Sequence, residues 1–536
     1  RNNQKSMSYA QEYQRNFLMT KEPIPGIENE YNYFKTFMPG IKLEEVNKLA
    51  NKWITKDNRV VVITAPEKEG VKVPTKENVF TLLYDVEKAD VKPYNDNVSN
   101  VPLIAEKPKG SPVVSEKKLD KVDAVEWTLK NGAKVVVKTT DFKKDEILFN
   151  AWSLGGNSLY DLKDEVSADF TADILSMSGI ANFDNITLDK MLSDKVFSVS
   201  PYISQLREGF TGNSSVKDVE TLLQMVYLYF AHPRFDPDAF KSYMTRMAGI
   251  LENKSASPQA AFQDTLHLVM ANYNKRAQPM TEALLKEANF NRIKEIGKER
   301  FHNAADFKFF FVGNIDLAKF KPLVEQYIGA IPSDNKLEHW RNLNINPPNG
   351  VVEKEVKKGQ EDKGIQYIVF HGKFDYNSEN RIEMDALGRI LTTRLLEVIR
   401  EDKSSVYTIG ASPSSSKFPE KDYTIAIYYG ASPEKLVELK KAVFDVIKDF
   451  VKNGPTDADL EKAKEQMLRE RETALRENGF WMGILSNTYY LKDGDFSKFG
   501  TYNQLVKGLT TKSLKKAFKE YFNFKDYISV ALEPAK

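Results

Sequence analysis

The sequence contains no cysteine among its 536 residues. Disulfide bonds, thiolate metal sites and cysteine nucleophiles are therefore all excluded. The absence does not identify a compartment, because exported and cytosolic proteins can both lack cysteine. An excess of charge of one sign is also lacking: 77 lysine and arginine residues nearly balance 75 aspartate and glutamate residues, leaving a formal net charge of +2. Without a strong positive field, we expect neither nucleic acid nor an anionic membrane as a partner.

Long apolar runs are missing as well. The longest, LLQMVYLYFA (222–231), is about half of the roughly 20 residues that a membrane-spanning helix requires, so we expect no membrane span. The phosphate loop Gly-x-x-x-x-Gly-Lys and the nucleophile elbow Gly-x-Ser-x-Gly are absent, which argues against the common nucleotide-binding and serine-hydrolase classes. The chain opens with Arg1 and has no charged-then-apolar leader, so we expect a processed or truncated product.

What is present is typical of a globular protein of about three or four domains, with 41% hydrophobic and 28% charged residues. One design recurs: an amphipathic helix, a charged turn and then a strand. Clear copies are PGIKLEEVNKLANKWITKDNRVVVITAPE (39–67) and KGLTTKSLKKAFKEYFNFKDYISVALEPA (507–535), with a looser copy at 289–316. The expected strands end at Pro66, Gly313 and Pro534, which gives three domain ends but only two domain beginnings.

These repeats predict the organisation of the chain. We expect the C-terminal tail of a preceding domain (1–67), a linker rich in Pro, Lys and Ser (68–120), and two complete domains (121–335 and 345–536). Asn131-Gly132 between two strand-like runs predicts a hairpin. Further strands are expected at 146–156 and 365–372, a hairpin around 406–430, and helices at about 166–178, 216–231, 236–252, 379–400, 434–452 and 456–476. Hairpins mixed with paired long helices predict an α+β fold of two two-layer domains, each with a mostly antiparallel sheet packed against helices.

The five histidines offer little support for a metal site. They are His232, His267, His302, His339 and His371, each more than thirty residues from the next. No pair has the spacing that places two ligands on adjacent helical turns, as zinc sites usually require. His371 in an apolar strand and His232 before Pro233 at a helix end have ordinary structural interpretations. We therefore expect no metal to be bound by this chain.

A pair of donors in VIREDKSSVYTIGAS (398–412) is more informative. Arg400 is expected to end a long helix, and Tyr407, seven residues later, to begin a strand. Both side chains could project from one corner and polarise a peptide carbonyl or hold an oxyanion. On spacing alone, the simpler interpretation is an arginine that caps its own helix and a tyrosine packed in a sheet.

Four segments carry a resemblance to a known family. They are WTLKNGAKVVVKTTDFKKDEILFNAWSLGGNS (127–158), GLTTKSLKKAF (508–518), REDKSSVY (400–407) and ENGFWMGIL (477–485). In order and spacing, the chain resembles the pitrilysin/insulinase family of zinc metallopeptidases, the inverzincins, and in particular its large bacterial members with four α+β domains. The resemblance covers nearly the whole chain, as the end of the second domain followed by the third and fourth domains.

The resemblance implies a degenerate catalytic helix. The active helix of the family carries H-x-x-E-H, two zinc ligands flanking a glutamate base, and it follows the same strand and glycine turn. Alignment with EVSADFTADILSMSG (165–179) places Phe170 and Ile174 at the histidine positions and Asp173 at the glutamate position. Neither apolar side chain can bind a metal, and Asp173 has no zinc-bound water to deprotonate.

The resemblance also implies partners and a place of action. Zinc is expected in an N-terminal catalytic half, encoded in the same precursor or as a separate subunit. The present chain would close the chamber around peptides or unfolded polypeptides, with Arg400 and Tyr407 reaching the scissile bond. The cell envelope or periplasm is expected, with the cytoplasm as the alternative. Two rival functions are a scaffold similar to the core subunits of the respiratory bc1 complex and a peptide-binding subunit. An intact H-x-x-E-H in the same or a neighbouring gene would favour the protease.

Overall fold

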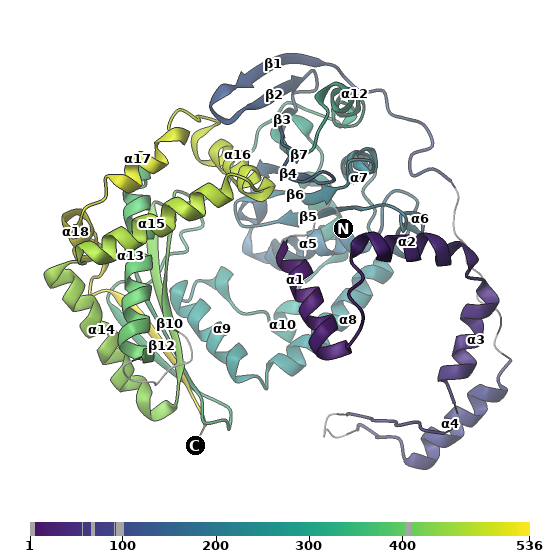
Figure 1. The fold of residues 1–536 in the computed structure, drawn as a ribbon, viewed down its shortest axis with the longest axis horizontal. Coiled ribbons are helices and arrows are strands. Elements are labelled where there is room, and N and C mark those ends of the chain that lie inside the picture. Colours follow the sequence, from purple (N-terminus) through teal and green to yellow (C-terminus); the bar gives the residue numbers. More distant parts are fainter. Residues whose placement is uncertain are drawn as a thin grey trace. The chain divides into compact units, whose positions relative to one another are not determined.

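The computed structural model describes residues 6–55, 57–65, 70–90, 92, 101–401 and 409–535. The chain divides into two compact units, Arg1–Asn97 and Val98–Lys536. Figure 1 shows the helices of the first unit in purple and the two sheets of the second unit in blue to yellow. Among the described residues, no helix is both long and apolar enough to cross a bilayer.

The first unit is helical. Its elements are α1 (Ser6–Arg15), the π-helical turn η1 (Asn16–Thr20), α2 (Ile27–Phe37), the 3₁₀ turn η2 (Met38–Gly40), α3 (Leu43–Trp53) and α4 (Lys76–Lys88). No apolar side chain is buried among its described residues, and Leu43, Val46 and Trp53 along one side of α3 are exposed. The unit therefore has amphipathic helices without a core of their own.

Residues 59–65, expected as a strand, form no strand in the described part of this unit. A strand is held by backbone hydrogen bonds to a neighbour, and the described residues of this unit supply none. The stretch expected as a linker, 68–120, contains α4 and also the strand β1 (Val113–Leu119) of the second unit. Thr75 begins α4, because its hydroxyl accepts the Asn78 amide N–H at 3.3 Å.

The first sheet of the second unit has seven strands among the described residues, in the order β1-β2-β3-β7-β4-β6-β5. The pairs are antiparallel except for β3 and β7, which run parallel. The predicted Asn131-Gly132 hairpin is confirmed between β2 and β3, with Gly132 at φ +88°. The remaining strands are β2 (Ala124–Leu129), β3 (Lys134–Thr139), β4 (Ile147–Leu154), β5 (Phe197–Ile203), β6 (Arg207–Ser214) and β7 (Lys308–Gly313).

The helices of this first half follow the strands. They are α5 (Glu165–Met177), α6 (Asn185–Met191), α7 (Val219–Ala231), α8 (Pro237–Lys254), α9 (Pro258–Met270), α10 (Glu282–Leu285), α11 (Phe290–Arg300) and α12 (Leu317–Tyr327). Short 3₁₀ turns are η3 (Asp120–Val122), η4 (Gly156–Leu159), η5 (Leu162–Asp164), η6 (Lys275–Ala277), η7 (Ala304–Asp306) and η8 (Ile328–Ala330).

The second sheet has five strands among the described residues, in the order β8-β12-β9-β11-β10. Only β8 and β12 run parallel. The strands are β8 (Val351–Lys357), β9 (Gly364–Lys373), β10 (Ile409–Ser416), β11 (Asp422–Ala431) and β12 (Tyr527–Glu533). The helices are α13 (Ser378–Leu395), the π-helical η9 (Leu396–Glu401), the 3₁₀ turn η10 (Pro433–Lys435), α14 (Leu436–Asn453), α15 (Asp457–Ala474), α16 (Asn478–Lys492), the 3₁₀ turn η11 (Phe499–Thr501), α17 (Tyr502–Lys507) and α18 (Thr511–Tyr521).

The two halves repeat one topology. The order β3-β7-β4-β6-β5 in the first sheet matches β8-β12-β9-β11-β10 in the second, with the parallel pair at the same end. The predicted helix-then-strand repeats appear as α11 followed by β7 and α18 followed by β12. In each, the strand lies inside its sheet with a neighbour on either side. The predicted α+β class with mostly antiparallel sheets is confirmed.

Helices cover both faces of each sheet. On one of the two faces, the covering helix belongs to the other half of the unit. Side chains alternate along β7, so that Phe309 and Phe311 face the core with α7 and α12, while Phe310 and Val312 face α16. The reciprocal contact is made by α9, whose Phe262, Leu266 and Val269 pack on Val369, Ile528 and Val530 of the second sheet. Figure 1 shows α9 beside β12 and α16 beside β4 and β7.

Candidate functional site

The candidate site begins at a glycine turn after β4. Gly155 and Gly156 have φ values of +141° and +62°. A Cβ on Gly156 would lie 2.1 Å from the backbone oxygen of Ser204, so only glycine fits there. The Gly156 N–H donates to the Glu208 carboxylate at 2.6 Å, which ties the turn to β6. The turn leads into α5, the helix expected to correspond to the catalytic helix of the family.

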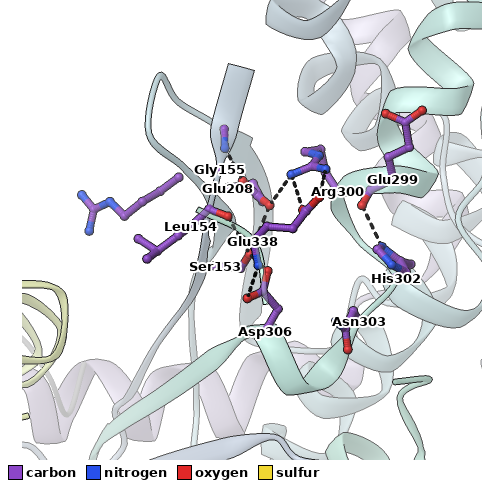
Figure 2. A network of polar contacts seen from close by, with 12 residues as sticks. Ser153, Leu154, Gly155, Glu208, Glu299, Arg300, His302, Asn303, Asp306 and Glu338 are labelled. Atoms are coloured by element: carbon purple, nitrogen blue, oxygen red, sulfur yellow. Dashed lines mark hydrogen bonds and ion pairs between the residues drawn. The ribbon is translucent and has the colours of Figure 1, made fainter. Parts of the chain in front are cut away.

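A buried polar network holds this turn (Figure 2). Glu208 and Arg300 are 1% and 5% exposed, and the Arg300 Nη1 atom lies 3.1 Å from Glu208 Oε1 and 2.7 Å from Glu338 Oε2. The Ser153 hydroxyl oxygen lies 3.1 Å from Glu208 Oε1 and 2.8 Å from Asp306 Oδ2, within hydrogen-bond distance of both carboxyl groups. The Arg300 Nε–H donates to the Tyr160 hydroxyl at 2.8 Å. The network therefore joins β4, β6, α11 and the segment around 338.

Burial is the main electrostatic influence on this network. It raises the pKa of the Glu208 carboxyl, against the opposing effect of Arg300, and the carboxylates of Glu338 and Asp306 raise that pKa further. Burial likewise raises the pKa of the Tyr160 hydroxyl. Each charged group in the network has a partner of the opposite charge or a hydrogen-bond donor. The arrangement is that of a closed structural network, which leaves no carboxylate free to activate a substrate.

The two positions of α5 that the resemblance aligns with metal ligands carry packed apolar side chains. Phe170 and Ile174 are 6% and 0% exposed and belong to a cluster with Tyr243, Leu251 and Ile293. The rings of Phe170 and Tyr243 meet edge to face with centroids 5.2 Å apart. Metal ligands at these two positions would have to displace this packing.

Asp173 is exposed and accepts a hydrogen bond of 2.7 Å from the Tyr243 hydroxyl. Burial raises the pKa of that tyrosine, and the hydrogen bond to Asp173 raises it further. Among the described residues, no group of three or more His, Cys, Asp or Glu side chains could hold a metal ion. The residues of α5 thus do not fit the zinc that the family resemblance implies, and Asp173 is a hydrogen-bond partner of α8.

The histidines lie apart in the fold. His371 on β9 is 7% exposed, and its Nε2 atom lies 3.9 Å from the Asp526 carboxylate without a hydrogen bond to any described residue. Burial lowers the pKa of His371, although Asp526 and Asp422 oppose this. The Nδ1 atom of His302 is 2.7 Å from the Glu299 backbone oxygen. His232 ends α7 and packs its ring against Tyr227.

The Arg400 and Tyr407 pair remains a prediction. The backbone of Arg400 lies in η9, directly after α13, as the expected long helix requires. Its side chain and the whole of Tyr407 lie outside the described residues. The strand β10 begins at Ile409, two residues after Tyr407.

Sequence reasoning missed the buried network and its two central residues. Glu208 and Arg300 are 92 residues apart in sequence, and nothing in the local pattern of either residue distinguishes it from an exposed charge. The only available signal was the Gly155-Gly156 pair, which marks a turn that some group must stabilise. Phe170, Asp173 and Ile174 were found because they occupy aligned positions on one helix.

The structure thus has two halves of one topology, each with a mostly antiparallel sheet, and a glycine turn that leads into a helix with buried apolar side chains. The family model described as "Peptidase M16 inactive domain" matches residues 288–467. A "Zinc protease PQQL-like" protein of Arabidopsis thaliana is 23% identical over 505 residues, covering 90% of this chain and 50% of that protein. In sequence and fold, the chain is therefore similar to M16 peptidases, the pitrilysin/insulinase family that its sequence resembles.

Solved structures share the fold. The periplasmic protease PqqL from Escherichia coli superposes with a TM-score of 0.72 at 16% identity, covering 99% of this chain and 58% of that one. The ferredoxin protease FusC, solved as a mutant in complex with Arabidopsis ferredoxin, gives a TM-score of 0.75 at 15% identity with the same coverage of 99% and 58%. The chain spans about half the length of the curated relatives that it matches.

Proposed function

We propose that this chain is the non-catalytic C-terminal half of a zinc-dependent metalloendopeptidase of the pitrilysin/insulinase type. The zinc and the general base belong to an N-terminal catalytic half, either in the same precursor or in a separate subunit. The present chain closes the substrate chamber over that half and contributes contacts to the bound peptide. In this organisation, residues 1–67 end the second domain, and residues 121–335 and 345–536 are the third and fourth domains.

One observation carries the proposal. The helix α5 follows the glycine turn where the family places its catalytic helix, yet Phe170 and Ile174 are packed in a core and Asp173 is bound to Tyr243. An apolar core at the ligand positions is incompatible with metal-assisted hydrolysis by this helix. A chain of a zinc peptidase family with this helix needs its metal from another domain.

The first unit supports the proposal of a catalytic half as partner, because one of its helices has an exposed apolar side. The segments α11 to β7 and α18 to β12 each place their strand between two neighbours. Residues 43–65 have the same helix-then-strand sequence design, but the apolar side of α3 is exposed and residues 59–65 form no strand in the described structure. We expect this segment to join a sheet of the catalytic half, with α3 covering that sheet.

The relatives also support a proposal for the substrates and the location of the assembled enzyme. The FusC structure is that of a complex with ferredoxin, and the PqqL structure is described as that of a periplasmic protease. We propose peptides or small polypeptides as the substrates of the assembled enzyme and the cell envelope as its location. Arg400 and Tyr407 are proposed to donate to the scissile peptide from the fourth domain.

The test compares the isolated chain with the assembled enzyme. The chain is purified alone and together with the polypeptide that carries H-x-x-E-H in the same or a neighbouring gene. Zinc content and cleavage of an internally quenched peptide are then measured. We expect no stoichiometric zinc and no cleavage for the isolated chain, and chelator-sensitive cleavage for the pair. Zinc-dependent hydrolysis by the isolated chain would contradict the proposal.

Two variants of α3 sharpen the test. Trp53→Asp removes an exposed aromatic ring from the proposed contact and should weaken association with the catalytic half by at least about tenfold. Lys48→Asp on the same helix introduces the same charge away from the apolar side and should change association little. Assembly without any cleavage, despite an intact H-x-x-E-H in the partner, would instead support the scaffold function.

A further inference from the structure

A pocket unrelated to α5 lies among the helices of the second half. It has a volume of about 750 Å³ and is bounded by the start of α13, the middle of β10, the end of α15, one side of α16 and the start of α17. Figure 1 shows α13, α15, α16 and α17 gathered on the side of the second sheet that carries these helices. The volume is within the range of pockets that hold small ligands, roughly 300–1,000 Å³.

Arg471 at the end of α15 lines this pocket and is held by aromatic rings. Its guanidinium carbon lies 4.5 Å from the ring centre of Phe480, 4.8 Å from that of Tyr502 and 5.2 Å from that of Phe499. Cation–π contacts of this kind fix the plane of the guanidinium but satisfy none of its N–H donors. No hydrogen bond or ion pair joins the Arg471 side chain to another described residue.

The acidic side chains near Arg471 already have other hydrogen-bond partners. Arg389 on α13 forms a fork with Glu470, with Nη1 and Nη2 at 2.9 and 2.7 Å from the two carboxylate oxygens, and its Nε lies 2.9 Å from Asp385. Glu470 therefore turns away from its neighbour Arg471. Burial lowers the pKa of the Arg471 guanidinium, with Tyr502 opposing, which is the effect expected of a half-buried cation without an acid partner.

The rest of the lining has a positive balance. Arg381, Lys492 and Lys498 line the pocket with Arg471, against two acids. One of these acids, Asp385, is paired with Arg389, and the other, Asp495, accepts the Ser497 backbone N–H at 2.9 Å. A carboxylate on a ligand would accept hydrogen bonds from the unpaired N–H groups of Arg471. A guanidinium and a carboxylate can form two parallel hydrogen bonds.

The remaining walls suit an apolar side chain and a peptide backbone. Phe480, Ile484, Leu491 and Phe496 supply apolar surface, and the polar residues Ser414 and Thr488 line the same space. Phosphate or another small polyanion would leave this apolar surface without a partner. The combination favours a carboxylate attached to an apolar residue.

We propose that this pocket binds the C-terminal end of a peptide, with the terminal carboxylate on Arg471 and an apolar last side chain among the aromatic rings. The proposal rests on the proposed function in that the bound peptide is a substrate or product of the assembled peptidase. The pocket acts as a specificity-determining subsite for chains that end in an apolar residue.

Two glycines that line the pocket allow a variant that obstructs it. Gly479 and Gly483 lie one turn apart on α16, and a Cβ built on either one meets no atom closer than 4.0 Å. Gly483→Leu would place a bulky side chain in the pocket and narrow it, while improving the helix propensity of α16. Gly249→Leu on α8 is the matched control, because its Cβ also meets nothing within 4 Å and it lies outside the pocket.

The experiment measures binding to the full 536-residue chain by fluorescence anisotropy. Three N-terminally fluorescein-labelled hexapeptides are compared: one ending in Phe as the free acid, the same peptide as the C-terminal amide, and an amide with Glu before the Phe. Variants are Arg471→Gln, Gly483→Leu and the controls Arg469→Gln and Gly249→Leu. Arg469 lies on the same helix but is exposed and paired with Glu465. Circular dichroism and urea unfolding confirm that each variant is folded.

We expect the free acid to bind at least about tenfold more tightly than either amide, as a charge-assisted hydrogen bond in a half-buried site predicts. Arg471→Gln should abolish this preference, Gly483→Leu should abolish binding, and the two controls should retain both. Equal binding of acid and amide, preference for the Glu-containing amide, or an unchanged preference in Arg471→Gln would each overturn the proposal. If Arg471→Gln fails to fold, Gly483→Leu still decides, because unchanged binding in that variant excludes the pocket.

The two proposals fail separately. Loss of the acid preference with intact zinc-dependent cleavage by the assembled pair would remove the C-terminal subsite and leave the peptidase function. An acid preference in the isolated chain without cleavage by the pair would keep the subsite and remove the peptidase function.

Discussion

The indole N–H of Trp152 on β4 donates a hydrogen bond of 2.9 Å to the hydroxyl of Ser486 on α16, across 334 residues of sequence. The same hydroxyl donates to the Asn150 side chain at 3.2 Å. At the start of α16, Thr140 donates to Asn478 at 2.6 Å. These hydrogen bonds hold α16 of the second half against the first sheet, both at the start of the helix and near its middle.

Truncation of the helix at this contact should destabilise both halves together. Leu485 is fully buried between α16 and the first sheet, so Leu485→Ala should lower the free energy of unfolding by about 2–5 kcal/mol. Urea unfolding followed by tryptophan fluorescence and by far-ultraviolet circular dichroism should shift to lower urea by the same amount for both signals. The exposed Val437→Ala on α14 should change stability by less than about 0.5 kcal/mol. Two separate transitions, with only one of them shifted, would show that the halves unfold independently.

Replacement of Asp173, the acid of α5 that the resemblance aligns with the glutamate base, should leave catalysis intact. Asp173→Asn keeps an acceptor for the Tyr243 hydroxyl but removes its charge, so the free energy of unfolding should fall by about 1 kcal/mol or less. Within about a factor of two, kcat/KM of the assembled enzyme on a quenched peptide should be unchanged, because no metal or base function is lost. A loss of a hundredfold or more would assign Asp173 a catalytic role.

Glu165 at the start of α5 should make stability depend on pH. Burial raises the pKa of its carboxyl to about 7, against the opposing effect of Arg276, and Asp169 adds to the rise. Between about pH 4.5 and pH 7, the folded chain keeps a proton on Glu165 that the unfolded chain has released, so the free energy of unfolding falls as the pH rises.

Glu165→Gln removes this titration. The stability of the original chain relative to the variant should therefore decrease by on the order of 2 kcal/mol over that range, measured by urea unfolding at a series of pH values. A constant difference, or one that grows with pH, would mean that Glu165 is ionised in the folded chain throughout.

The predicted donor Tyr407 should matter for turnover. Tyr407→Phe removes only the hydroxyl, and if that group donates to the developing oxyanion, kcat of the assembled enzyme should fall by about 10²-fold with little change in KM. Tyr428→Phe on β11, an exposed tyrosine, is the matched control and should retain activity. An unchanged kcat in Tyr407→Phe, or an equal loss of stability and activity, would favour the simpler interpretation of a packed tyrosine.

Local patterns were enough to predict much of the fold. The Asn131-Gly132 hairpin and α7, α8, α14 and α15 occur close to their expected positions, because each is determined by turn residues or by a single apolar stripe. Residues 59–65 show the limit of this reasoning, since β-branched residues form a strand only where a neighbour provides hydrogen bonds. The packing of α9 and α16 across the halves depends on contacts between residues hundreds of positions apart and has no local signal.

The site was predictable only where a motif is contiguous. Phe170, Asp173 and Ile174 lie within one helical turn and could be aligned directly. Glu208 with Arg300 and the pocket around Arg471 required the tertiary structure, because their partners come from separate elements. For Arg471, the informative feature is that no described acid forms an ion pair with its side chain, which no sequence window can reveal.

The helices α9 and α16 each pack on the sheet of the other half, which limits how the chain can be cut into fragments. A break in the connection between the halves, near residues 332–350, would leave two fragments that each expose one apolar sheet face and carry the other's cover. Such fragments should be poorly soluble apart and should complement each other when mixed. Deletion of either half would therefore expose the sheet face that its helix covers in the other half.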